Sequence, residues 1–116
     1  MRSNVSIHQL SEEDQGIIYR CLVAALKGPF FPDWEFQTLF GINRDALDKV
    51  VEDWPNVDET NDDAFLAINN SFVNLLYYPH DSDQGWDEYN LAPRQTIEKV
   101  FHRWKALSVG EVKESE

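Results

Sequence analysis

The segment that most constrains the fold of this chain runs from Asp62 to His80 and reads DDAFLAINNSFVNLLYYPH. Its apolar side chains recur at spacings of three, four and three residues, which is the period of an α-helix: Phe65, Ile68, Phe72 and Leu75. Further apolar residues lie beside this stripe: Leu66, Val73 and Leu76. A helix that is apolar on more than one face packs against neighbours on several sides. We therefore predict a central buried helix over residues 62–78, which Pro79 ends because proline disfavours helical geometry at the residue before it.

Asparagines occupy the third side of this predicted helix, at positions 69, 70 and 74. A buried amide without a hydrogen-bond partner costs about 1–3 kcal/mol. If the helix is central, these amides must therefore find partners on neighbouring elements.

Caps and apolar stripes predict further helices on both sides of the central one. Ser11, with Asp14 three residues later, is a variant of the capping box that begins a helix. The other predicted helices, each bounded by capping residues, glycine or proline, span residues 11–28, 33–41, 43–55 and 93–107. We predict an all-α fold, a bundle of four to five helices around residues 62–78.

A length of 116 residues fits one domain. Residues 1–10 are expected to form an N-terminal arm, in which Val5 and Ile7 alternate with polar residues and favour an extended conformation. Residues 11–108 are predicted to form the single helical domain, and residues 109–116 a flexible acidic tail.

The formal net charge of −11 arises from 21 acidic and 10 basic residues. Such a surface repels nucleic acid and anionic lipid and speeds encounter with basic partners. The same charge can serve solubility alone, and that alternative stays open. The sequence shows neither a charged-then-apolar leader nor an apolar run of membrane-spanning length. We therefore predict a cytoplasmic protein that binds neither nucleic acid nor membrane.

Few residues have the spacing that catalysis or metal binding needs. Cys21 is the only cysteine, which excludes an intrachain disulfide and a cysteine-based zinc cluster. Its place on an apolar stripe predicts a buried structural thiol. The histidines stand far apart, at positions 8, 80 and 102, and no glycine-rich phosphate loop is present. We predict no catalytic residue, no metal site and no cofactor, although a site built from carboxylates alone stays open.

The stretch DSDQG at residues 81–85 resembles the start of a calcium-binding loop. The EF-hand pattern requires its glycine one place later and a glutamate at the twelfth position, which here is Ala92. The pattern therefore fails, and calcium binding by another arrangement of the acids in this segment stays open.

Residues 33–54 have the outline of a helix-turn-helix, with a short helix, a Gly-Ile-Asn corner and a second helix. Any tight corner between two helices produces this outline. The second helix would present four acids to DNA, namely Asp45, Asp48, Glu52 and Asp53. Because duplex binding depends on cationic contacts with phosphates, a helix-turn-helix transcription-associated protein is the alternative function and not the leading one.

The last predicted helix, residues 93–107, has a basic outer face, made of Arg94, Lys99, Arg103 and Lys105. This face would complement the acidic helix over residues 44–54, either within the bundle or between two copies of the chain. A homodimer therefore stays open.

Aromatic and acidic residues gather where the central helix ends. Aromatic side chains supply much of the binding energy of protein interfaces, and the charges around them steer association. The candidate partner-binding residues are Tyr77, Tyr78, Asp81, Asp83, Trp86, Asp87, Glu88 and Tyr89. The alternative is that Trp86 and Tyr89 fold back over the bundle as a lid on its core.

The Leu-Leu-Tyr-Tyr-Pro segment at residues 75–79 precedes an acidic loop and a helix that carries Ile97, Val100, Trp104 and Lys105. This arrangement resembles the DNase-type colicin immunity proteins, which are small acidic four-helix proteins of bacteria. In that family the paired tyrosines anchor the protein on its nuclease, and acids on the second helix set specificity. The resemblance implies that Tyr77 and Tyr78 are anchors, here at the end of a long helix where the family has a single turn.

The charge, the aromatic site and this resemblance together predict an acidic protein-binding module. The expected role is that of an immunity- or antitoxin-type inhibitor, which occludes a basic partner protein such as a toxin or nuclease.

Overall fold

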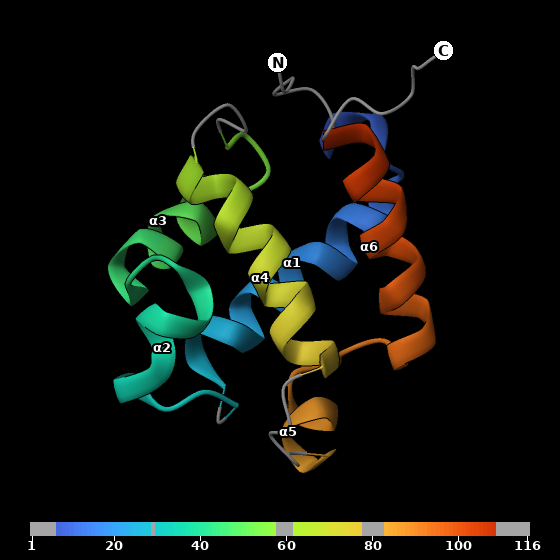
Figure 1. Cartoon of the computed structure of the whole chain (residues 1–116). Coiled ribbons are helices and arrows are strands. Elements are labelled where there is room, and N and C mark those ends of the chain that lie inside the picture. Colours follow the sequence, from blue (N-terminus) through green and yellow to red (C-terminus); the bar gives the residue numbers. More distant parts are fainter. Residues whose placement is uncertain (1–6, 29, 58–61, 78–82, 109–116) are drawn as a thin grey trace.

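The computed structural model describes residues 7–28, 30–57, 62–77 and 83–108, which form helices without any strand (Figure 1). A short 3₁₀ helix comes first and six α-helices follow it in the described part of the chain. Their bounds are η1 Ile7–Gln9, α1 Glu12–Lys27, α2 Asp33–Phe40, α3 Arg44–Asp53, α4 Asp62–Tyr77, α5 Asp83–Glu88 and α6 Arg94–Ser108. The prediction of an all-α fold is confirmed.

Helix α4 is the centre of the arrangement. In Figure 1 it runs through the middle of the molecule, with α2 and α3 on one side and α6 on the other, and it contacts α1, α2, α3 and α6. Ile68, Phe72 and Leu75 are completely buried. The ring of Phe72 stacks on that of Phe101 in α6, with centroids 4.9 Å apart. The central position predicted for this helix is confirmed, because its several apolar faces meet different neighbours.

Two of the three asparagines of α4, Asn70 and Asn74, find partners on α2. The side-chain amide of Asn70 donates to the carbonyl of Phe40 at 2.8 Å, and that of Asn74 donates to the carbonyl of Leu39 at 3.0 Å. The last carbonyls of an α-helix have no partner within the helix itself. The polar side of α4 therefore satisfies the C-terminal end of α2 and fixes one helix against the other.

The start of α1 combines a local cap with a contact to α6. The hydroxyl of Ser11 accepts a hydrogen bond from the backbone N–H of Asp14 at 3.0 Å, as the capping pattern predicts. The carboxylate of Asp14 is buried and accepts two hydrogen bonds from the guanidinium of Arg103, at 2.8 and 2.9 Å. Asp14 thus takes part in the N-terminal cap of α1 through its backbone and joins α1 to α6 through its carboxylate.

Helix α5 differs from the expectation of a loop between Pro79 and the last helix. Two aromatic residues explain the difference, Trp86 within α5 and Tyr89 directly after it. The indole N–H of Trp86 donates to the carbonyl of Ala92 at 2.8 Å. The hydroxyl of Tyr89 donates to the carbonyl of Lys27, the last residue of α1, at 3.1 Å. A turn of helix directs two aromatic side chains that are three residues apart to the same side of the chain. The local sequence favours a loop, but these tertiary contacts favour a helix.

The described part of the N-terminal arm also differs from the expectation. Residues 7–9 form a 3₁₀ helix rather than an extended segment, and Ile7 and Leu10 are buried. The N–H of Leu10 donates to the carbonyl of Ile7 at 3.0 Å. The two apolar residues are three apart, which matches a 3₁₀ turn better than the alternation of a strand. The acidic tail predicted at residues 109–116 lies outside the described residues.

Candidate partner-binding surface

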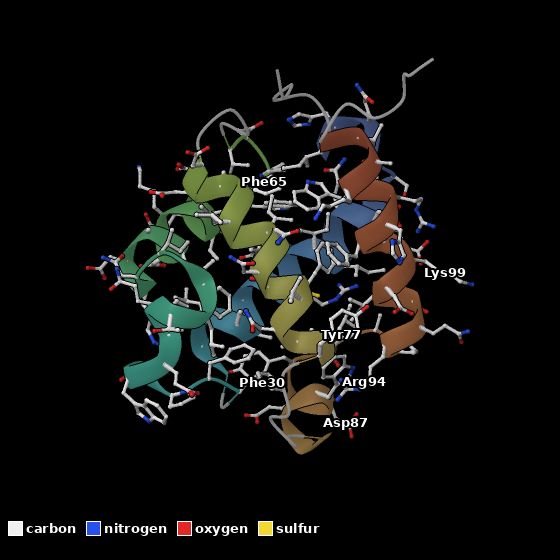
Figure 2. The ribbon with its side chains drawn as sticks, viewed as in Figure 1. Phe30, Phe65, Tyr77, Asp87, Arg94 and Lys99 are labelled. Carbon is white, nitrogen blue, oxygen red and sulfur yellow. The ribbon has the colours of Figure 1, made fainter. Side chains whose placement is uncertain are left out.

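Tyr77 ends α4 and is the exposed aromatic residue of the predicted site. Its side chain is 58% exposed. The hydroxyl donates to the Glu98 carboxylate of α6 at 2.8 Å, and this hydrogen bond is the main reason why the pKa of Tyr77 lies above its ordinary value. The bond orients the ring while most of its surface stays in solvent. Figure 2 shows Tyr77 at the same end of the molecule as Arg94 and Asp87.

Arg94 holds the end of α4 beneath this tyrosine. Its guanidinium donates to the carbonyls of Leu75 and Leu76, at 3.2 and 3.5 Å. The same group lies 4.2 Å from the centre of the Trp86 ring. These carbonyls belong to the last turn of α4, which has no intrahelical donors for them. Arg94 therefore caps α4 and joins it to α5, so the backbone that carries Tyr77 is well supported.

Trp86 and Tyr89 support the surface and do not form its exposed part. Trp86 is only 9% exposed, and its ring meets Phe30 edge-on at a centroid distance of 6.3 Å. Tyr89 is partly buried, and its hydroxyl is bonded to the backbone of α1. The sequence left two possibilities open, contact with a partner or folding back over the core of the bundle. The burial of Trp86 favours the second. Trp86 is buried and Tyr89 packs partly buried against the core, and direct contact of these two residues with a partner stays a prediction.

The acids of the predicted site divide between α5 and residues that the structure does not describe. Asp87 and Glu88 are exposed on α5. Asp83 begins α5, but its side chain lies outside the described residues, as do Tyr78 and Asp81. The exposed, described part of the predicted site is therefore Tyr77, Asp87 and Glu88.

The corner between α2 and α3 is formed as the sequence predicts, and Arg44 is its principal contact. The side chain of Arg44 donates to Asp33 at 2.7 Å, to the carbonyl of Phe31 at 2.8 Å and to the carbonyl of Leu26. Its guanidinium also lies 4.3 Å from the centre of the Phe36 ring. The one arginine of this segment is thus engaged in the packing of α1, α2 and α3.

The outer face of α3 is acidic. Its exposed charged residues are Asp45, Asp48, Lys49, Glu52 and Asp53. Four carboxylates with one ammonium repel a phosphate backbone, and the engagement of Arg44 removes the cation that a recognition helix would use. These observations favour a structural corner over a DNA-binding element.

Arg103 and Lys105, two basic residues of α6, pair with α1 and α4. Arg103 bonds to Asp14 of α1, and the ammonium of Lys105 donates to the side-chain oxygen of Asn69 in α4 at 3.0 Å. Lys99 is exposed, as Figure 2 also shows. These two contacts join α6 to α1 and α4, and a match between α6 and the acidic α3, within the bundle or between two copies, stays a prediction.

Cys21 lies in the core, as predicted. Burial raises the pKa of its thiol to about 12, against a smaller opposing effect of Arg20. We expect iodoacetamide to alkylate Cys21 very slowly in the folded protein at pH 8, where about 10⁻⁴ of the thiol is ionised, and rapidly in denaturant. Mass spectrometry of the two samples measures both rates, and equal rates would contradict the burial.

The same shift predicts a pH dependence of stability. The folded-state pKa of Cys21 lies above the reference value of 9.0. Its contribution to stability is therefore complete below pH 9 and is lost as the pH rises towards 12.

Sequence reasoning missed Trp34, which is 80% exposed on α2. A signal was present, because Trp34 does not fall on the buried stripe that contains Phe36 and Phe40. Exposed tryptophan side chains are typical of protein interfaces. Sequence reasoning also missed a pocket between α3 and α4, because the residues around it come from separate parts of the chain.

Neither a metal-binding cluster nor a membrane-spanning helix is found in the described part of the chain. No group of three or more histidine, cysteine, aspartate or glutamate side chains there is placed to hold a metal ion. Among the described helices, none combines the length and apolarity that crossing a bilayer requires.

Comparison of this chain with protein-family models, with curated proteins and with solved structures finds no match. The physical features of the site are therefore the basis for assigning a function.

Proposed function

We propose that this protein is an acidic protein-binding module, an immunity- or antitoxin-type inhibitor that occludes a basic partner in the bacterial cytoplasm. The observation that carries the proposal is Tyr77, which is 58% exposed while its hydroxyl is bonded to Glu98. An exposed aromatic ring that is already oriented loses little conformational entropy when a partner covers it. Large aromatic residues of this kind are frequent energetic centres of interfaces.

Charge supports the choice of partner. The chain has a net charge of −11, and Asp87 and Glu88 are exposed on α5. Asp87 lies at the same end of the molecule as Tyr77 (Figure 2). Such a surface attracts a basic protein and raises its association rate, most strongly at low ionic strength. The proposed mechanism is occlusion, in which Tyr77 anchors the inhibitor and the acids neutralise cations on the partner. The resemblance of residues 75–105 to the DNase-type colicin immunity proteins supports the same role.

The test begins with the genes that lie beside the one for this chain. One of them is expected to encode a larger protein with a basic domain, which copurifies with the chain upon coexpression. Tyr77→Ala should weaken this complex by about 2 kcal/mol or more, which is about thirtyfold in Kd. Isothermal titration calorimetry measures the change, and circular dichroism checks that the helical fold is kept.

Tyr77→Phe is the matched control, because it keeps the ring and removes only the hydrogen bond to Glu98. We expect a much smaller loss of affinity for this variant. An unchanged Kd for Tyr77→Ala would contradict the role of Tyr77 as an anchor.

The helix-turn-helix alternative rests on the corner between α2 and α3. A gel-shift titration with duplex DNA at low salt tests it, since binding driven by phosphate contacts is strongest there. Binding of the duplex under these conditions would favour the alternative over the proposed inhibitor.

A further inference from the structure

A pocket of about 320 Å³ lies between α3 and the first turn of α4. Its inner wall is apolar and consists of Ala46, Val50, Val57 and Ala64. Val50, Val57 and Ala64 are buried, with 6% or less of their surface exposed. Two of the four wall residues are alanines, one on each helix, and their short side chains leave the space open.

The rim of this pocket is charged. It is formed by the carboxylates of Asp45, Asp53 and Asp63 and by the ammonium of Lys49, all of them exposed. The ammonium of Lys49 lies 3.8 Å from the carboxylate of Asp53, one turn further along α3. Both partners are well exposed, so this ion pair is weak and Lys49 is easily displaced.

An apolar wall below an acidic rim matches a particular kind of side chain. Arginine and lysine have long aliphatic stems that pack on apolar surface and cationic ends that stay at the polar boundary. Acidic side chains are repelled by this rim, and purely apolar ones gain nothing from its negative charge. The volume lies at the lower end of the range of about 300–1,000 Å³ for ligand pockets and suits a single side chain.

Geometry favours arginine over lysine and over a metal ion. No group of three or more histidine, cysteine, aspartate or glutamate side chains among the described residues is arranged to hold a metal ion, and this includes the three carboxylates of the rim. The guanidinium of arginine is planar and has five N–H donors, so it can bridge two separated carboxylates, whereas an ammonium is a compact charge.

We propose that the pocket between α3 and α4 receives an arginine side chain of the basic partner. This proposal rests on the proposed function for the existence of that partner. The pocket lies at the N-terminal end of α4 and Tyr77 ends the same helix, a separation of about 20 Å along its axis. The pocket is therefore a second point of attachment, distinct from the surface around Tyr77.

The test is an NMR titration of the isotope-labelled full chain with N-acetyl-arginine-N-methylamide, which needs no identified partner. Methyl signals of Ala46, Val50, Val57 and Ala64 are expected to shift in a saturable manner. The citrulline analogue has the same shape without the charge, and it should bind about tenfold more weakly or not at all. The lysine analogue should also bind more weakly than the arginine compound. Absence of saturable shifts, or equal binding of the citrulline or lysine analogue, overturns the proposal.

Variants of α3 make the test sharper, because the affinity for the arginine compound is expected to change in opposite directions. Asp45→Asn and Asp53→Asn should weaken binding of the arginine compound, whereas Lys49→Ala should strengthen it. Asp48→Asn is the matched control, since Asp48 is an exposed acid of the same helix that does not line this pocket. An equal effect of Asp48→Asn would indicate general attraction by the acidic helix and would overturn the site.

The outcomes distinguish a failure of the arginine pocket from a failure of the proposed inhibitor function. Tyr77→Ala should leave the titration with the arginine compound unchanged. Loss of arginine binding with a partner complex that still depends on Tyr77 contradicts the pocket alone. Arginine binding without any partner complex contradicts the proposed inhibitor.

Discussion

Replacing Phe72 with alanine is expected to lower the free energy of unfolding by about 3–5 kcal/mol, a large part of the stability of a domain of this size. The Phe72 side chain is completely buried at the centre of α4. Its ring lies 4.9 Å from that of Phe101 and 6.2 Å from that of Trp104, centroid to centroid. Truncation leaves a cavity between α4 and α6 that the surrounding rings cannot fill. Urea denaturation followed by circular dichroism measures the loss.

Phe65→Ala is the comparison within the same helix. Phe65 is partly exposed, although its ring packs against that of Trp104 with centroids 5.4 Å apart. The Phe65 side chain buries less apolar surface than that of Phe72. We therefore expect its truncation to lower the free energy of unfolding by less than about 3 kcal/mol. Equal losses for the two variants would contradict the burial of Phe72 at the centre of the core.

Arg44→Met is expected to cost about 2–4 kcal/mol, because it removes charged hydrogen bonds and leaves two carbonyls without their donor. Those carbonyls belong to Leu26, at the end of α1, and to Phe31, before α2. Methionine preserves much of the aliphatic packing against Phe36, so the loss reports mainly on the polar contacts. Thermal and urea unfolding measure it.

Two control variants separate the contributions of Arg44. Asp33→Asn removes only the ion pair with a carboxylate that is 89% exposed, and should cost less than about 1 kcal/mol. Arg44→Lys should recover only part of the stability, since one ammonium cannot donate in the three directions of a guanidinium. A fully stable Arg44→Met protein would show that Arg44 does not hold the corner and would leave it available for phosphate contacts.

The candidate site was predictable in part. The position of Tyr77 at the end of an apolar helix indicated an exposed aromatic residue, and it is exposed. For Trp86 the sequence left both surface and core open, because both outcomes give the same local pattern. Its burial depends on Phe30 and Arg94, which belong to separate segments of the chain.

The sequence by itself determined the local features of this protein. The helical period of α4, the cap of Ser11 on α1 and the cap of Asn43 on α3 depend on residues within a few positions of each other. Such features survive in almost any tertiary setting, because each is a short-range preference of the backbone and its nearest side chains. The all-α fold and the central place of α4 follow from them.

The tertiary structure alone decided the contacts that join distant segments. The amides of Asn70 and Asn74 required partners, but their sequence contains no indication that these would be carbonyls of α2, more than 25 residues earlier. The helical form of α5 and the pocket between α3 and α4 likewise arise where separate segments meet. Hydrogen bonding and burial act through space and not along the chain, so these contacts exist only after the helices have packed.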